Sequence, residues 1–252
     1  MQHRVIVFRT IDSTNSEAQR RVSKGELGPV WLRADEQVSG RGRSGRSWVS
    51  PIGNLSATLI FQPECQLDNL HQLSLVAGLA AHDTIERALG QGPSSAKPQL
   101  KWPNDILIGN RKIGGILVEG ASRGCQSVAM VGFGMNLAVT PEVGGRHATC
   151  LGDYMASSTP EQFLQELDCA LHAWLEVWGR GTRFQDITEA WLLRAHPTGT
   201  SLTINTHQGR VSGDFLGLER DGALLLRETK GTVRSFHFGD VAIVKSQRDH
   251  DN

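Results

Sequence analysis

Long apolar runs are absent from this 252-residue chain. A membrane-spanning helix needs about 18 to 20 consecutive apolar residues, and no stretch of the sequence approaches that length. Near the start, the apolar stretch Val5 to Phe8 is too short to form the core of a signal peptide. These absences predict a cytoplasmic protein with no membrane attachment.

Cysteine is scarce, and the cysteines present are isolated. Cys65, Cys125, Cys150 and Cys169 are widely spaced and form no CxxC pair. Zinc knuckles and compact disulfide frameworks both need closely paired cysteines, so neither is expected. We expect free, buried thiols in a reducing compartment.

Net charge is also absent, because 26 Lys and Arg balance 26 Asp and Glu. This balance argues against a nucleic-acid binder with a broad basic face. The charge is uneven, however: no acid occurs between Gln37 and Pro63, while Arg41, Arg43 and Arg46 lie close together. A local cationic segment on a neutral protein fits one anionic ligand better than a polyanion.

The pattern before Pro197 alternates strands and helices, without repeats, low-complexity tracts or linkers. Apolar and alternating stretches predict strands at 5–8, 30–34, 55–61, 99–108, 111–119 and 127–133. Helical spacing and capping signals predict helices at about 14–23, 69–89, 159–178 and 184–195. Residues 1–197 are therefore expected to form one α+β domain.

The pattern after Pro197 changes to short strands at close spacing. Strands are expected at 201–206, 211–218, 223–228, 233–237 and 241–244, separated by Gly-containing turns. Such a series predicts a small β-barrel domain over 198–247. The polar residues 248–252 are expected to form a frayed tail.

Residues 40–48 read GRGRSGRSW. Glycines let the backbone approach a ligand, and interleaved arginines can surround phosphate oxygens. A solvated surface loop and an RNA-binding tail are the alternatives. The stretch lies between two expected strands and ends in Trp48, which favours a phosphate site. It matches neither the GxGxxG fingerprint nor the P-loop.

Two polar stretches, KWPNDIL at 101–107 and RKIGGILVE at 111–119, flank a hairpin signal at Gly109-Asn110. The expected register pairs Ile108 with Arg111, Leu107 with Lys112, and Asp105 with Gly114. Asp105 and Lys112 would then share one face of the hairpin. Surface decoration is the alternative reading. A nucleotide with Mg²⁺ would use the lysines for phosphates and Asp105 as a metal ligand or ribose contact.

Two weaker motifs complete the set. GFGMN at 132–136 ends an apolar strand, and the amide of Asn136 could pair with an adenine edge; an ordinary turn is the alternative. DSTN at 12–15 is a helix cap that could also hold a polar ligand group at a helix N-terminus.

Taken in chain order, the stretches are DSTN, then Gln37 with GRGRSGRSW, then KWPNDIL with RKIGGILVE, then GFGMN. In that order and at these spacings they closely resemble the biotin protein ligases, and the match runs from about residue 8 to 245. The resemblance implies a mixed, mainly antiparallel sheet flanked by helices, like that of class II aminoacyl-tRNA synthetases, and a C-terminal SH3-like barrel. It also implies activation of biotin by Mg·ATP to biotinyl-AMP, then transfer to a lysine of a biotin carboxyl carrier protein. Because the match begins within the first dozen residues, we expect no DNA-binding domain and no operator binding.

The resemblance also implies roles for individual residues. Biotin is expected at Ser13, Thr14, Asn15, Gln37, Gly40, Arg41, Lys112, Gly114 and Gly115. ATP is expected at Arg43, Arg46, Trp48, Lys101, Asn104, Asp105 and Asn136, with Mg²⁺ at Asp105. Lys112, Arg43 and Arg46 are expected to act in catalysis. The arginine loop is expected to order over the adenylate, since the mixed anhydride must be kept from water.

Two rival functions stay open at this point. A lipoate or octanoate ligase of the related fold would share the chemistry, but Ser13, Thr14 and Gln37 would lack partners beside an apolar chain. The other rival is a biotin or nucleotide sensor without catalysis. A sensor would not need both a carboxylate and an ammonium group, Asp105 and Lys112, on one face. The sequence leaves open whether the protein is a monomer or a homodimer.

Overall fold

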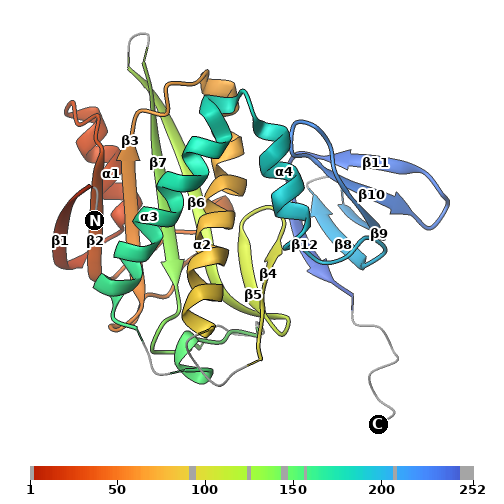
Figure 1. Cartoon of the computed structure of the whole chain (residues 1–252), viewed down its shortest axis with the longest axis horizontal. Coiled ribbons are helices and arrows are strands. Elements are labelled where there is room, and N and C mark those ends of the chain that lie inside the picture. The colour runs from red at the N-terminus through yellow and green to blue at the C-terminus, as the bar shows by residue number, and fades with distance from the viewer. Residues whose placement is uncertain are drawn as a thin grey trace.

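A computed structural model of the chain describes residues 3–90, 95–123, 126–142, 147–155, 158–206 and 209–244. Within these ranges the chain forms two sheets, one of seven strands and one of five, with the larger sheet packed against helices (Figure 1). None of the helices found there is long and apolar enough to cross a membrane.

The larger sheet has the strand order β1-β2-β3-β7-β6-β5-β4. Only the β1–β2 pair is parallel; the other neighbours are antiparallel, which confirms the expected mixed, mainly antiparallel sheet. Its strands are β1 (Arg4–Ile11), β2 (Val30–Gln37), β3 (Leu55–Phe61), β4 (Pro98–Lys101), β5 (Asp105–Ile108), β6 (Arg111–Arg123) and β7 (Gln126–Met135).

Helices cover both faces of this sheet. On one face lie α2 (Leu73–Leu89) and α3 (Pro160–Trp178), which run side by side in Figure 1, and α4 (Phe184–Leu192) packs against both. On the other face, Ala18 and Val22 of α1 (Thr14–Ser23) pack on inner strands. Because both faces are covered, all residues of β3 are buried. Next to the start of α1, this second face is open and forms a cavity.

Local predictions differ from the structure in three places. Thr14 with Glu17 three residues later has the pattern of a capping box, but Ser13 caps α1 instead, since its hydroxyl accepts from the Ser16 amide. The helix expected from 69 begins as a 3-10 helix (Leu67–Gln72) before α2 starts. The strand expected over 99–108 is two strands, because Trp102 and Pro103 form a turn between β4 and β5. The capping box of α3 is confirmed.

The hairpin register is partly wrong. Ile108 pairs with Arg111 and Leu107 with Lys112 as expected, but Asp105 pairs with Gly115 rather than Gly114. The register shifts beside Ile106, where β6 carries one residue more than β5, a β-bulge. A bulge moves every later residue of its strand to the other face, so Gly115 takes the place expected for Gly114.

The smaller sheet has the order β11-β10-β9-β8-β12 and is antiparallel throughout. Its strands are β8 (Ser201–Thr206), β9 (Gly209–Leu218), β10 (Leu224–Glu228), β11 (Val233–Phe236) and β12 (Asp240–Ile243). Five strands are confirmed, but β11 and β12 lie at opposite edges and do not pair in the described ranges, so a closed barrel is not formed there. The expected tail at 248–252 lies outside the described residues.

The described cysteines are free, but only one of them is buried. Cys150 is buried, Cys65 is partly buried, and Cys169 is exposed, so the expectation of buried thiols holds for Cys150 alone. Cys125 lies outside the described residues.

Candidate functional site

A cavity of about 770 Å³ opens on the α1 face of the larger sheet. It crosses the sheet from the end of β2 to β4, and β12 of the smaller sheet borders its far end. Most of the expected site residues line it: Ser13, Thr14, Asn15, Gln37, Arg41, Arg43, Arg46, Trp48, Lys101, Asn104, Asp105, Lys112 and Gly115. Residues that lie far apart in the sequence thus converge on one cavity.

At one end of the cavity the neutral polar side chains of Ser13, Thr14 and Gln37 line the wall. Gln37 accepts two hydrogen bonds through Oε1, from the Thr14 amide (2.8 Å) and the Thr14 hydroxyl (3.1 Å), and donates from Nε2 to Ser50 (2.8 Å). Ser13 and Thr14 are nearly fully buried. Their position at the start of α1 also favours a partially negative ligand atom there. This end can bind a neutral polar ring through oriented donors and acceptors.

Sequence reasoning missed two residues that hold this end together. Thr58 on β3 donates to Asn15 Oδ1 (2.7 Å), and Asn15 Nδ2 donates to the carboxylate of Glu119 (2.8 Å). Glu119 also accepts from Arg41 of the arginine loop (3.1 Å). A signal for Glu119 was present in the sequence, since it is an acid at the end of the otherwise apolar strand of the RKIGGILVE motif. The sequence around Thr58 contains no such signal.

The arginine loop folds back on itself beside the cavity. The Trp48 amide donates to the Gly40 carbonyl (2.8 Å), and the Gly42 amide donates to the Arg46 carbonyl (2.7 Å). A β-carbon on Gly40 would overlap the Trp48 carbonyl, so this close approach requires glycine. Gly40 itself does not line the cavity. The glycine shapes the loop, while the side chains around it face the ligand space.

Each arginine of the loop has a different partner. Arg41 pairs with Glu119, Arg43 donates to Asn104 Oδ1 (3.3 Å), and Arg46 pairs with Asp240 on β12 (2.8 Å). Burial and, after it, the neighbouring Arg46 cation lower the pKa of Arg43. Arg43 has a neutral amide as its side-chain partner, so an incoming anion would compensate its charge.

Trp48 lies deep in the cavity wall. Its indole packs where a side chain on Gly134 would be, and Asn15 occupies the corresponding space above Gly132. The two glycines of GFGMN therefore make room for two site residues. On its other side the Trp48 ring lies 5.3 Å from Lys112 Nζ, a cation–π distance. The indole thus connects the arginine loop to the centre of the cavity.

Lys112, Asp105 and Lys101 form a row of charges at the centre. Asp105 Oδ1 pairs with Lys112, and Oδ2 pairs with Lys101 (2.8 Å). Burial alone would raise the pKa of Asp105, but the two ammonium groups outweigh it and hold the pKa at about 2. Asp105 therefore stays ionised and fixes both ammonium groups beside the cavity. Gly115 faces this row, and its missing side chain leaves room for the Lys112 ammonium.

Besides Gly40, two more expected site residues, Gly114 and Asn136, lie outside the cavity wall. Gly114 faces Met135, on the side away from Lys112, as the bulge requires. Asn136 is 2% exposed, and its amide donates to the carbonyls of Thr149 (3.0 Å) and Lys112 (3.4 Å). Asn136 therefore holds the backbone that carries Lys112. Its contact with adenine stays a prediction.

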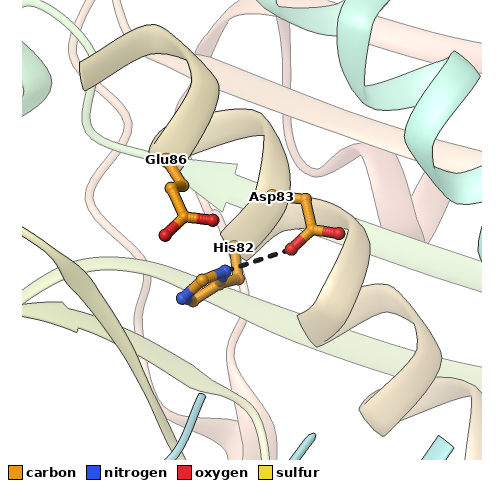
Figure 2. Close-up of side chains that lie close together, drawn as sticks. All are labelled: His82, Asp83 and Glu86. Atoms are coloured by element: carbon orange, nitrogen blue, oxygen red, sulfur yellow. Dashed lines mark hydrogen bonds and ion pairs between the residues drawn. The ribbon is translucent and has the colours of Figure 1, made fainter. Parts of the chain in front are cut away.

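A cluster of potential metal ligands lies away from the cavity, on α2. It consists of His82, Asp83 and Glu86 (Figure 2). His82 and Asp83 already have protein partners: His82 bonds to Asp83 (3.2 Å) and the Pro98 carbonyl (3.1 Å), and Asp83 also accepts from Arg194 (2.9 Å). These contacts indicate a structural network rather than a metal centre.

Comparison with known proteins agrees with this geometry. The model of the biotin/lipoate A/B protein ligase family matches residues 7–136, and that of the biotin protein ligase C-terminal domain matches residues 202–244. The biotin–[acetyl-CoA-carboxylase] ligase of Paracoccus denitrificans is 38% identical over 231 residues, which cover 87% of this chain and 92% of that protein. This chain belongs to the biotin protein ligases.

Solved structures of other biotin protein ligases resemble it over most of their length. The Aquifex aeolicus ligase in complex with biotin and ATP has a TM-score of 0.79 and 25% identity, covering 96% of this chain and 99% of that one. The Leishmania major ligase in complex with biotinyl-5-AMP has a TM-score of 0.60 and 26% identity, covering 93% and 99%. The resemblance stated from the motifs is confirmed.

Proposed function

We propose that this ligase joins biotin to ATP, giving biotinyl-AMP and pyrophosphate, and passes the biotinyl group to a lysine of a carboxylase's biotin carboxyl carrier protein. One observation carries this proposal: the cavity has a neutral polar end at Ser13, Thr14 and Gln37 and a cationic centre at Lys112 and Lys101. Biotin has the same order of groups, a polar ring followed by a carboxylate that must meet a phosphate.

In the first step, a carboxylate oxygen of biotin bonds to the α-phosphorus of ATP. The bond from that phosphorus to the bridging oxygen breaks, and its electron pair leaves with pyrophosphate. Both reactants are anions, so bringing them together requires fixed positive charge. Lys112, held by Asp105, would contact the reacting carboxylate and phosphate oxygens, and Arg43 and Arg46 would contact phosphate oxygens. The protein needs no nucleophile of its own for this step.

In the second step, the amine nitrogen of the carrier lysine bonds to the acyl carbon of biotinyl-AMP. The bond from that carbon to the AMP oxygen breaks, AMP leaves with the electron pair, and the amine gives up a proton. Between the steps the anhydride must be kept from water. The loop at 40–48, tied to both Glu119 and Asp240, would cover it.

The Mg²⁺ expected at Asp105 fits the present arrangement poorly, because both carboxylate oxygens already pair with ammonium groups. Asp105 would be free to bind a metal only after Lys101 and Lys112 had turned toward phosphate oxygens. Mg²⁺ in nucleotide sites is commonly held by phosphates and one or two carboxylates. When bound, it would add charge neutralisation on the phosphates to that supplied by the protein's own cations.

A lipoate or octanoate ligase is the weaker alternative. The hydrogen bonds of Gln37 with Thr14 and Ser50 build a buried polar surface at the substrate end. An unbranched apolar chain would leave the remaining donors and acceptors of that surface unpaired, which costs free energy. Biotin's ureido ring offers partners for them.

The deciding experiment has two readings. Pyrophosphate release from ATP is measured with biotin, lipoate or octanoate, and a recombinant carrier domain incubated with enzyme, ATP and biotin is analysed by mass spectrometry. We expect release with biotin only, and one biotinyl group on the carrier. A preference for lipoate would contradict the substrate assignment, and binding without turnover would indicate a sensor.

Three finer expectations belong to the same proposal. An SH3-like topology of the smaller sheet is supported by the match of residues 202–244 to the family's C-terminal domain, although its edge strands β11 and β12 do not pair in the described ranges. A cytoplasmic location is supported by the free thiols of Cys65, Cys150 and Cys169. Lack of operator binding is supported by the balanced charge.

A further inference from the structure

A histidine that the sequence motifs do not include lines the far end of the cavity. His196 follows α4 and stands beside Lys101, at the opposite end from Ser13 and Gln37. The strand order explains the arrangement: Gln37 ends β2, Lys112 lies on β6, Lys101 ends β4, and His196 lies beyond that edge. A ligand that begins at Gln37 and reacts at Lys112 extends toward His196.

The backbone around His196 is anchored on both sides. The Leu100 amide donates to the Arg194 carbonyl (2.8 Å), and Leu100 forms a parallel bridge with Ala195, which adds a short segment to the edge of β4. After the histidine, the Pro197 carbonyl accepts from the Thr200 hydroxyl (2.7 Å). His196 is therefore a fixed part of the cavity wall.

Asp83 on α2 also contacts the segment just before His196. Asp83 accepts from Arg194 Nε (2.9 Å) and from Trp174 Nε1 (2.9 Å), and the Arg194 guanidinium lies 5.3 Å from the centre of the Trp174 ring. Figure 2 shows Asp83 on the helix beside His82. Asp83 of this cluster thus helps to hold the segment that carries His196.

The His196 side chain is left with an unused polar atom. Its Nε2 is buried and has no hydrogen-bond partner within the part of the chain that the structure describes. A buried polar atom without a partner destabilises the protein, so a ligand that pairs with it gains affinity. Burial and, after it, the Lys101 ammonium lower the pKa of His196, so the imidazole is neutral near pH 7 and can donate from Nε2.

Resting on the proposed function, we propose that His196 binds the polyphosphate of ATP, donating from Nε2 to an oxygen of the β- or γ-phosphate and then of the pyrophosphate product. The neighbouring charges favour phosphate over adenine at this end. Lys101 lies beside His196, and Arg46 reaches the same wall by its pair with Asp240. Adenine has no charge for these cations to balance.

His196 acts in the first step and not in the second. When the α-phosphorus bond breaks, negative charge grows on the departing pyrophosphate, and a fixed donor there stabilises the transition state more than bound ATP. Once pyrophosphate has left, transfer to the carrier lysine involves the acyl carbon and AMP alone. A change at His196 therefore separates the two half-reactions.

The test measures the half-reactions separately in the full chain. The first is biotin-dependent exchange of labelled pyrophosphate into ATP; the second is transfer from purified biotinyl-AMP to a carrier domain. For His196→Ala we expect kcat/KM for ATP in exchange to fall about 10- to 100-fold, KM for pyrophosphate to rise, and the transfer rate to stay unchanged. For His196→Gln we expect partial recovery, because its amide can donate from near the position of Nε2.

His237→Ala is the matched control, since His237 is an exposed histidine of the smaller sheet that does not line this cavity. It should change neither half-reaction. Unchanged exchange in His196→Ala, or an equal loss in exchange and transfer, would overturn the proposal. If His196→Ala unfolds, His196→Gln alone decides by its exchange-to-transfer ratio. Failure of the proposed function is distinct: the unmodified enzyme would then show no biotin-dependent exchange.

Discussion

Trp48 and Gly134 occupy one space: the indole of Trp48 lies where any side chain on Gly134 would be. The contact joins the loop at 40–48 to strand β7, since Gly134 lies 86 residues after Trp48 in the sequence. It explains why GFGMN belongs to a site although its Asn136 lies outside the cavity. Gly134 affects the site through Trp48, because its missing side chain leaves room for the indole.

Gly134→Ala should therefore displace Trp48 and disturb both the arginine loop and Lys112. We expect the adenylation rate to fall by at least about tenfold, because misplacing reacting groups by about an ångström is costly. The adenylation rate is measured by quenching the reaction at set times and quantifying the biotinyl-AMP formed. Gly78→Ala on α2 is the control, since its nearest neighbours are 3.6 Å from the added carbon. A fully active Gly134→Ala would show that the contact is dispensable.

Lys112→Ala should abolish adenylate formation while leaving biotin binding measurable. Removing one donor to developing charge typically costs about 100- to 1,000-fold in rate, whereas the Ser13, Thr14 and Gln37 end would stay intact. Calorimetry gives biotin affinity, and pyrophosphate release gives the rate. An unchanged rate would count heavily against the mechanism.

Asp105 should make stability depend on acid pH. Its folded pKa of about 2 lies below the ordinary value of 3.8, so its contribution is present above about pH 4 and is lost as pH falls through the folded pKa. The shift corresponds to about 2.5 kcal/mol. We expect the stability gap between wild type and Asp105→Asn, measured by urea unfolding, to narrow between pH 4 and pH 2. A gap that stays constant would refute the assignment.

The arginine loop should order with its ligand. Apart from Trp48, which packs on Gly134, residues 40–48 are tied to the rest of the molecule mainly by side-chain pairs. The pairs of Arg41 with Glu119 and of Arg46 with Asp240 are partly exposed and stabilise little each. We expect fast hydrogen exchange in the empty protein and protection with biotin or biotinyl-AMP. Strong density for the loop in a ligand-free crystal would contradict this.

The features that the sequence predicted correctly are those that involve residues close together in the chain. Helix α1, the Ile108–Arg111 turn and the convergence of Lys112 with Asp105 were predictable, because each depends on periodicity or spacing within a few residues. The prediction for Gly114 was wrong: its position faces away from Lys112, because a single bulge residue reverses the alternation of faces and has no local signature in the sequence.

The sequence alone determined the chemistry and the family of this protein, since the cations, the carboxylate and the glycine-rich loop are written in local motifs. Only the tertiary structure decided which groups meet: Thr58 with Asn15, Arg41 with Glu119, and His196 with the cavity. Those meetings depend on how strands far apart in the chain pair and how segments add to a sheet edge. Spacing within one element carries no information about that pairing, because it is fixed by packing of the whole core.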